Sequence, residues 1–403
     1  MEKKTAGFIQ SAHPFDETFA VRSYEAGVAD RVTLPTLCNY MQEIAGLSAD
    51  SLGWGIRKLQ EEGLTWMLSR LHVKVSRYVP WGETVTMRTW PCGMKGRLIA
   101  NRSFQAADSE GSLILEAHSE WLYVDMKAQR IARLPESFAS LVPAGTPAVA
   151  LEDLGGKSPS LPSVTSSVEV LVRRGDLDFN DHVNNVHYAE WMLEAVPERQ
   201  DGPEEMDIVF HKAARAGDRL VSEAFCDGVR TCHRIRRPSD DSVLATAVML
   251  WRAPKRVVVC LGSNIEPRMD YLDRAQAALS AMPSTRLLSS GGTDETDPVG
   301  VPDEFAAMKF LNRVLLFETC LSPQEFSRRM HAIEDDLGRV RGPVRNAPRT
   351  IDIDMIDYEG VVSDDPSLVL PHPRAASRPF VMEPMARMGL ALGAAPALLH
   401  PDA

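Results

Sequence analysis

The sequence lacks several features that would place it in other classes of protein. No apolar run is long enough to cross a bilayer, and the N-terminal residues, MEKKTAGF, have no apolar stretch typical of a signal peptide. The formal net charge is −11, whereas general nucleic-acid binding needs a basic surface. The six cysteines form no C-x-x-C pair and have no histidine at zinc spacing, which favours reduced thiols. We therefore expect a cytoplasmic protein with neither a nucleic-acid nor a membrane partner.

A glycine-rich phosphate-binding loop is also lacking. Gly155–Ser158 ends like such a loop, but Leu151 stands where its leading glycine belongs. Gly53–Gly55 lacks the third glycine of a dinucleotide-binding motif and the strand before it. Any nucleotide site in this chain must therefore be built from other residues.

The length of 403 residues predicts two or three domains. A helix followed by several strands is predicted over residues 19–134, and a similar order returns after residue 167. Between them, periodicity is replaced by Pro, Ser, Gly and Ala, which indicates a linker. From residue 256 onward helices and strands alternate, which is typical of an α+β sandwich. The predicted divisions are a first domain at 1–140, a linker at 141–165, a second domain at 166–253 and a third at 254–403.

Two carboxylates alternate with isoleucines in the stretch Arg339–Asp354, after four arginines. Side chains two apart on a strand share a face, so Asp352 and Asp354 converge while Ile351 and Ile353 face the core. Paired carboxylates suit Mg²⁺, and clustered guanidinium groups suit phosphate oxygens. The stretch therefore predicts a nucleoside-triphosphate site. Alone, the two aspartates are also compatible with polar positions on a half-exposed strand.

The same stretch belongs to a set of motifs that resembles 6-hydroxymethyl-7,8-dihydropterin pyrophosphokinases over about residues 256–390. The motifs are LGSN at 261–264, FLN at 310–312, Glu334, R-x-R at 339–341, PRTIDID at 348–354 and PHPR at 371–374. The resemblance implies a ferredoxin-like fold that transfers pyrophosphate from ATP to the hydroxymethyl group of the pterin. This chemistry depends on positioning and charge neutralisation more than on a protein nucleophile.

The resemblance also implies roles for individual residues around the nucleotide. Asp352 and Asp354 would bind two Mg²⁺ ions that bridge the phosphates of ATP. Other residues would contact the nucleotide, with arginines bracing its polyphosphate: Arg341, Arg349, Arg378, Glu334 and His372.

Around the pterin, the resemblance implies that Asn312 reads the ring edge and that Phe310 and Phe380 pack on the ring. Phe310 stands where the family commonly has tyrosine. Thr296 lies in a loop that would close over the substrates. Individually, both phenylalanines are also compatible with a place in the hydrophobic core.

The N-terminal two thirds, about residues 16–253, resemble acyl-acyl-carrier-protein thioesterases. The motifs are WMLSR at 66–70, RYVPWGE at 77–83, TWP at 89–91 and DLDFNDHVNNVHYAEW at 176–191. The resemblance implies two hotdog domains, each a long helix wrapped by an antiparallel sheet. The predicted fold class is therefore α+β, with tandem hotdog domains followed by a ferredoxin-like domain.

By this resemblance, His182 orients or deprotonates a water molecule, Asn180 contacts the thioester and Asp178 fixes the arrangement. The alternative is that Asp178 and Asn180 cap a helix that begins near Val183, a common role for these residue types. In that case His182 is a packed loop histidine.

The sequence departs from the thioesterase pattern at one catalytic position. Relatives carry glutamate in a motif such as E-Y-x-K-E-A, and the corresponding stretch here is Val209–Ala214, with Ala213 at the catalytic position. Loss of a water-activating carboxylate lowers the rate by orders of magnitude. His211 and Glu194 are the candidate replacements.

These observations predict a bifunctional enzyme: a pterin pyrophosphokinase joined to an acyl-thioester hydrolase. The expected partners are ATP and hydroxymethyldihydropterin for the C-terminal part, and an acyl thioester or acyl carrier protein for the N-terminal part. Two alternatives remain for the hotdog domains. In the first, the hotdog domains catalyse another step near folate synthesis. In the second, they bind an acyl chain or carrier protein without catalysis.

Overall fold

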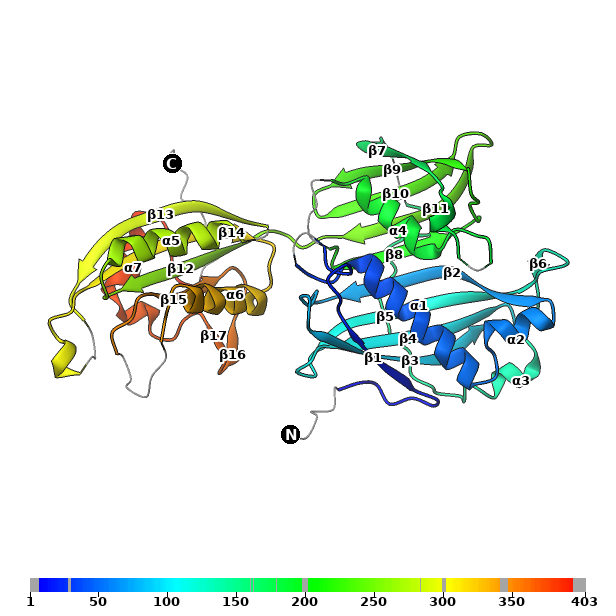
Figure 1. Cartoon of the computed structure of the whole chain (residues 1–403), viewed down its shortest axis with the longest axis horizontal. Helices are drawn as coiled ribbons and strands as arrows, with labels where there is room; N and C mark the ends of the chain where they lie inside the picture. Colours follow the sequence, from blue (N-terminus) through cyan, green and yellow to red (C-terminus); the bar gives the residue numbers. More distant parts are fainter. Residues whose placement is uncertain are drawn as a thin grey trace. The chain divides into compact units, whose positions relative to one another are not determined.

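The computed structural model describes residues 7–27, 30–159, 161, 163–178, 180–197, 202–282, 284–298, 302–340 and 347–393. The chain divides into two units, Met1–Arg252 and Ala253–Ala403, and each is described by itself (Figure 1). Among the described residues, no helix has the length and apolar character needed to cross a membrane.

The N-terminal unit is built on one antiparallel sheet in the order β1-β3-β4-β5-β2-β8-β11-β10-β9-β7, with β6 paired to β5. Its first-half strands are β1 (Phe15–Ala20), β2 (Leu64–Val75), β3 (Thr84–Lys95), β4 (Ile99–Ala107), β5 (Leu113–Asp125) and β6 (Arg130–Ile131). Its second-half strands are β7 (Ser166–Leu171), β8 (Glu205–Phe210), β9 (Arg219–Asp227), β10 (Arg230–Arg237) and β11 (Ser242–Leu250).

Two helices lie on one face of this sheet, which we call the helix face (Figure 1). The first, α1 (Leu34–Ser51), begins where Thr33 accepts a hydrogen bond from the Thr36 N–H, and it buries a stripe of apolar side chains. The second, α4 (Asn185–Glu194), has the same place in the second half. Short helices complete the unit: α2 (Ile56–Glu61), α3 (Glu136–Ala139) and the 3₁₀ helix η1 (Arg174–Asp176).

Strands β2 and β8 join the two halves into one sheet. They pair antiparallel from Arg70 opposite Val209 to Lys74 opposite Glu205. On the helix face, one continuous hydrophobic core takes side chains from both halves, including those of α1 and α4. The two predicted hotdog folds are confirmed, and they share one sheet and one core.

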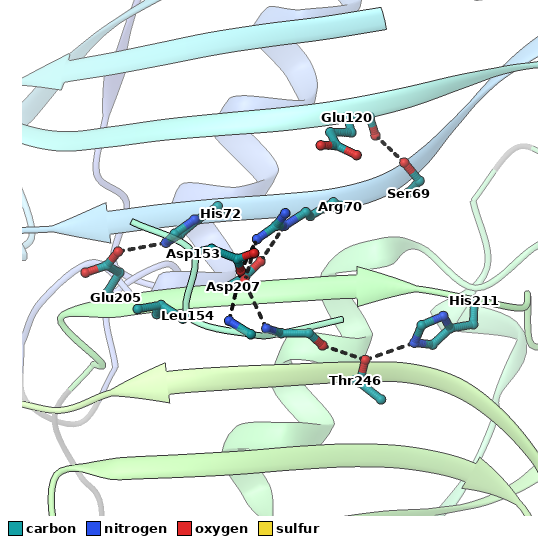
Figure 2. Close-up of polar contacts among 12 residues, drawn as sticks. Ser69, Arg70, His72, Glu120, Asp153, Leu154, Glu205, Asp207, His211 and Thr246 are labelled. Carbon is teal, nitrogen blue, oxygen red and sulfur yellow. Dashed lines mark hydrogen bonds and ion pairs between the residues drawn. The ribbon is translucent and has the colours of Figure 1, made fainter. Parts of the chain in front are cut away.

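The predicted linker lies against the opposite face of the sheet, which we call the linker face. Arg70 of β2 donates to Asp207 Oδ1 and Oδ2 of β8, both at 2.8 Å, and to Asp153 Oδ1 of the linker at 2.8 Å (Figure 2). The Gly156 N–H donates to Asp207 Oδ2 at 3.0 Å, and a Cβ at position 156 would meet the Asp207 carbonyl oxygen at 2.3 Å. The linker is therefore bound along the seam between the halves.

The C-terminal unit is a four-stranded antiparallel sheet in the order β13-β14-β12-β15. Its strands are β12 (Lys255–Ser263), β13 (Thr285–Thr296), β14 (Phe310–Thr319) and β15 (Asp352–Tyr358), with a separate hairpin of β16 (Ser363–Asp365) and β17 (Leu368–Leu370). The helices are α5 (Arg268–Ser280), α6 (Pro323–Asp336) and α7 (Pro379–Arg387), with the 3₁₀ helices η2 (Asp303–Phe305) and η3 (Ala375–Ser377).

Hydrophobic side chains cover both faces of this sheet. Helices α5 and α6 pack on the face that carries Val257 and Val259, and α7 packs on the face that carries Val258 and Cys260. The β-α-β-β-α-β order with these antiparallel pairs is the ferredoxin-like arrangement. The predicted fold class is therefore confirmed for the whole chain.

Removing the charge of Arg70 should destabilise the N-terminal unit strongly. The Asp207 side chain is fully buried, so Arg70→Met would leave its carboxylate without its cation. We expect a loss of about 3–5 kcal/mol in the free energy of unfolding, measured by urea denaturation.

Lys95→Met is the matched control, because the Lys95 side chain, which forms an ion pair with Glu120, is 65% exposed. It should cost less than about 1 kcal/mol. Equal losses in the two variants would contradict the role given to Arg70.

Candidate functional site

The polar motif residues of the second hotdog half form a tight loop between η1 and α4. Asp178 Oδ1 accepts hydrogen bonds from the Asn180 N–H at 2.8 Å and the His182 N–H at 3.4 Å. The Asp178 N–H donates to the His182 carbonyl oxygen at 2.8 Å, and Asp181 at the tip has a φ of 59°. Asp178 therefore fixes the backbone that carries Asn180 and His182.

Helix capping does not explain this loop. The cap of α4 is Asn184, whose side-chain oxygen accepts from the Val186 N–H at 3.2 Å. The alternative in which Asp178 and Asn180 cap the helix is therefore wrong. The cap is Asn184, the first residue of the Asn-Asn pair in the motif, and Asp178 shapes the loop before it.

The side chains of Asn180 and His182 remain available for a ligand. Asn180 Oδ1 accepts from Gln60 Nε2 at 2.7 Å, and the Asn180 Nδ2 group has no partner within the described part of the chain. Among the described residues, the His182 ring has no hydrogen-bond partner. An amide donor beside an imidazole suits the polarisation of a carbonyl group and the activation of water.

Ala213 lies beside this loop, as the sequence comparison with the thioesterase motif predicts. The Val183 N–H donates to the Ala214 carbonyl oxygen at 3.2 Å, and the Ala214 N–H donates to Tyr188 Oη at 2.9 Å. These bonds bring the backbone around Ala213 next to His182. The position that carries glutamate in relatives is therefore near the histidine, but here it holds a methyl group.

Neither candidate replacement for that glutamate reaches the loop. Phe210 faces α4, with its ring 5.6 Å from that of Tyr188, so His211 points to the linker face. There His211 Nε2 lies 2.9 Å from Thr246 Oγ1, which donates to the Gly156 carbonyl oxygen (Figure 2). Glu194 is exposed at the far end of α4, about 14 Å along the helix from its start.

An apolar pocket opens between the two helices and the sheet. It is narrow: the volume that the centre of a water-sized sphere can occupy within it is about 30 Å³. Asn185, three residues after His182, lies in its wall. Much of the remaining wall is apolar and comes from both halves of the sheet, including Leu68, Leu71, Phe104, Trp121, Ile208 and Phe210.

In the C-terminal unit, the two predicted metal ligands lie together on β15. Asp352 and Asp354 are half-buried, while Ile351 and Ile353 are buried in the core, so the predicted alternation is correct. Arg349 Nη2 lies 2.9 Å from Asp352 Oδ2, and Arg378 Nη1 donates to Asp354 Oδ2 at 2.9 Å. Each carboxylate thus has an arginine partner.

Each of these arginines also lies over an aromatic ring. The Arg349 guanidinium is 5.3 Å from the centre of the Phe310 ring, and that of Arg378 is 5.5 Å from the Phe380 ring. Two similar groups of aspartate, arginine and phenylalanine therefore converge from β14, β15 and the start of α7. The structure brings together residues that the sequence assigned separately to metal, phosphate and pterin.

The sequence predicts that Glu334 contacts the nucleotide, but in the structure its side chain binds the backbone of β15. Glu334 is 2% exposed, and its Oε1 accepts from the Ile353 N–H at 2.8 Å. Arg339 forms ion pairs with both Glu334 and Asp352. Arg339 received no role from the sequence, although it stands in the arginine-rich stretch. Direct contact of Glu334 with a nucleotide stays a prediction.

Thr296 and Asn312 meet on neighbouring strands. Asn312 Nδ2 donates to Thr296 Oγ1 at 2.7 Å, and Asn312 is 5% exposed. Its Oδ1 would lie 3.1 Å from a Cβ added at Gly262, so the glycine of the LGSN motif leaves this oxygen room. The amide therefore presents an acceptor that suits a heterocycle with N–H groups.

His372 offers a hydrogen-bond donor at the same end of the sheet. Its Nδ1 accepts from the Arg374 N–H at 3.2 Å, so the proton of the neutral ring lies on Nε2. Burial lowers the pKa of His372, which keeps the ring neutral near pH 7. Arg341 lies outside the described residues.

The residues of this site fit Mg²⁺ and a polyphosphate. Three carboxylates (Glu334, Asp352, Asp354) balance three arginines (Arg339, Arg349, Arg378), and Mg²⁺ with phosphates supplies replacement partners for both sets. Buried polar atoms of Asn264, Arg349 and Thr350 have no hydrogen-bond partner among the described residues, as expected beside a polar ligand site. In the described part of the chain, no group of three or more His, Cys, Asp or Glu is placed to hold a metal.

Comparison with known families finds matches to both parts of the chain. Residues 12–142 match the acyl-ACP thioesterase N-terminal domain, and residues 161–253 match the acyl-ACP thioesterase C-terminal domain. Residues 258–389 match 7,8-dihydro-6-hydroxymethylpterin-pyrophosphokinase. The chain thus carries both hotdog domains of the acyl-ACP thioesterase family, followed by a domain of the pyrophosphokinase family.

Individual relatives match the N-terminal part. A chloroplastic palmitoyl-acyl carrier protein thioesterase from Cuphea hookeriana is 32% identical over 206 residues, which are 47% of this chain and 48% of that protein. An oleoyl-acyl carrier protein thioesterase from Arabidopsis thaliana is 30% identical over 215 residues, which are 48% of this chain and 58% of that protein. The chain thus spans about half the length of these curated relatives.

Solved structures show the same fold for this part. A 12:0-ACP thioesterase from Umbellularia californica superposes with a TM-score of 0.53 at 24% identity, over 61% of this chain and 99% of that one. An acyl-ACP thioesterase from Bacteroides thetaiotaomicron gives a TM-score of 0.52 at 22% identity, over 59% of this chain and 97% of that one.

Proposed function

We propose that the chain is a bifunctional enzyme. Its C-terminal unit transfers pyrophosphate from ATP to 6-hydroxymethyl-7,8-dihydropterin, and its N-terminal unit hydrolyses acyl thioesters, with acyl carrier protein as the expected carrier. The observation that supports the first activity is the convergence of two aspartate–arginine–phenylalanine groups at one end of the β15 sheet.

In the pyrophosphoryl transfer, the hydroxymethyl oxygen would form a bond to the β-phosphorus of ATP and release its proton to water. The bond from this phosphorus to the α-phosphate oxygen would break, and AMP would leave. Bound Mg²⁺ neutralises the phosphate charge. Asp352 and Asp354 would hold it, and Arg349 and Arg378 would move from these carboxylates to phosphate oxygens. Asn312 would hold the pterin edge through Oδ1, and the His372 Nε2–H would donate to the nucleotide.

In the thioester hydrolysis, the acyl chain would lie in the apolar pocket and its carbonyl group would meet the Asp178–His182 loop. His182 would take a proton from water as the water oxygen bonds to the carbonyl carbon. Asn180 Nδ2–H would donate to the carbonyl oxygen as negative charge develops there. The carbon–sulfur bond then breaks, and the thiolate takes the proton from His182.

Ala213 supports a second candidate for the N-terminal unit: an acyl-binding module without turnover. The loop and the pocket are formed, but position 213 carries no carboxylate, and neither His211 nor Glu194 lies where it could replace one. Turnover of a pterin intermediate by the hotdog unit would instead point to the folate-related alternative.

The kinase assignment predicts that each metal carboxylate is essential. Asp352→Asn and Asp354→Asn should each lower pterin-dependent AMP release by about 100-fold or more, because they remove charge from the metal site. Chromatographic quantification of AMP over a Mg²⁺ titration measures this effect.

Asp364→Asn is the matched control, since Asp364 is exposed in the β16–β17 hairpin. It should retain wild-type AMP release. Undiminished release in both Asp352→Asn and Asp354→Asn would rule out the metal assignment.

The thioesterase assignment predicts a gain of function at position 213. Ala213→Glu places a carboxylate beside the His182 loop and should raise kcat for acyl-thioester hydrolysis by about 100-fold. Release of free thiol from acyl-pantetheine substrates of several chain lengths measures kcat, with His182→Ala as the blank.

Ala213→Gln separates the effect of the charge from that of side-chain size, and it should give no such gain. If glutamate and glutamine behave alike while both variants remain folded, the catalytic interpretation of this position is wrong.

A further inference from the structure

The short helix α2 of the first hotdog half reaches the polar loop of the second half. Its Leu59 is 3% exposed and packs in a cluster that includes Trp54, Trp66 and Phe138. The Trp54 and Phe138 rings lie edge to face with centres 5.1 Å apart, and Trp66 Nε1 donates to the Trp54 carbonyl oxygen at 3.0 Å. The aromatic cluster therefore fixes the position from which Gln60 extends.

Gln60 makes one contact that crosses between the halves. Its Nε2 donates to Asn180 Oδ1 at 2.7 Å, across 120 positions of sequence. Asn180 is half-buried, and its backbone N–H is already bound to Asp178. A residue from the first half thus holds the side chain, while a residue of the loop itself holds the backbone.

The direction of this hydrogen bond decides what Asn180 presents to a ligand. When Gln60 is the donor, Asn180 Oδ1 is occupied and Nδ2 is free to donate. With the bond reversed, Asn180 Nδ2 would be occupied and the acceptor Oδ1 would face the ligand. A thioester carbonyl group that gains negative charge needs a donor and is repelled by an acceptor.

We propose that Gln60 is a positioning residue that sets the orientation of the Asn180 amide, so that Nδ2 is directed to the thioester carbonyl oxygen. This inference rests on the proposed thioesterase function and deepens it. It couples the half that contributes α1 and much of the pocket wall to the half that contributes the polar loop. Gln60 would act through Asn180, without contacting the carbonyl group or the attacking water molecule itself.

Two variants at this position test the proposal against wild type. Gln60→Ala frees the Asn180 amide to rotate and should lower kcat by about 10-fold with KM nearly unchanged. Gln60→Glu has the same shape, but an ionised carboxylate only accepts, so it draws Nδ2 toward itself and turns Oδ1 to the substrate. We expect a loss in kcat of about 100-fold or more, beyond that of the alanine variant.

The pH profile distinguishes this role from a purely structural one. The carboxyl group introduced by Gln60→Glu can donate again once it is protonated. The kcat of this variant relative to wild type should therefore rise as the pH falls toward the carboxyl pKa. Gln60→Ala should show no such relative recovery. Gln10→Glu, an exposed glutamine in the same unit, controls for the added charge and should match wild type.

Calorimetry separates the proposed hydrolysis from the positioning role of Gln60. It measures the binding of a non-hydrolysable acyl-pantetheine thioether that retains a carbonyl group. If wild type does not exceed the His182→Ala blank but Gln60→Glu binds this compound more weakly than Gln60→Ala, the proposed hydrolysis fails and the positioning role stands. If Gln60→Glu equals or exceeds Gln60→Ala in both kcat and binding, the positioning role is overturned.

Discussion

The N-terminal unit depends on the pairing of β2 with β8. This pairing makes one sheet from two hotdog halves, and the buried carboxylate of Asp207 is neutralised across it by Arg70. The same strands carry Leu71 and Ile208 into the apolar pocket on the opposite face. Because side chains alternate along a strand, one pairing fixes both the linker on one face and the pocket on the other. The halves therefore form one structural unit.

A different constraint organises the C-terminal unit, where charge is concentrated at one end of a small sheet. Asp352 and Asp354 share a face of β15, and each is balanced by an arginine that also lies on a phenylalanine ring. These ion pairs and ring contacts hold the charged side chains in place when no ligand is bound. They are also exchangeable, because Mg²⁺ and phosphate oxygens offer stronger partners to the same groups. The arrangement suits a site that exchanges these internal ion pairs for contacts with a charged ligand.

The sequence predicted the parts of this structure that follow from local periodicity. The prediction that Asp352 and Asp354 share a face was correct, because side chains two residues apart on a strand point the same way. Helix α1 was predictable from apolar residues at helical spacing. Strand β13 has a weak sequence signal, because it is a polar edge strand with a Gly-Gly pair and two register shifts. The contact from Gln60 to Asn180 could not be predicted, since no local pattern connects residues 120 positions apart. The family motif supplied the Asp178–His182 loop, but only the fold shows that His211 points to the other face.

We propose that the apolar pocket, which both halves line, and the polar loop of the second half serve one acyl thioester. A crystal structure of the full chain with a non-hydrolysable acyl-pantetheine thioether that retains a carbonyl group tests it most directly. The account predicts the acyl chain between α1 and the sheet, beside Leu71 and Phe104, with the carbonyl oxygen about 3 Å from Asn180 Nδ2 and the His182 ring facing the carbonyl carbon. An acyl chain bound elsewhere, or a carbonyl group turned away from Asn180 and His182, would contradict it.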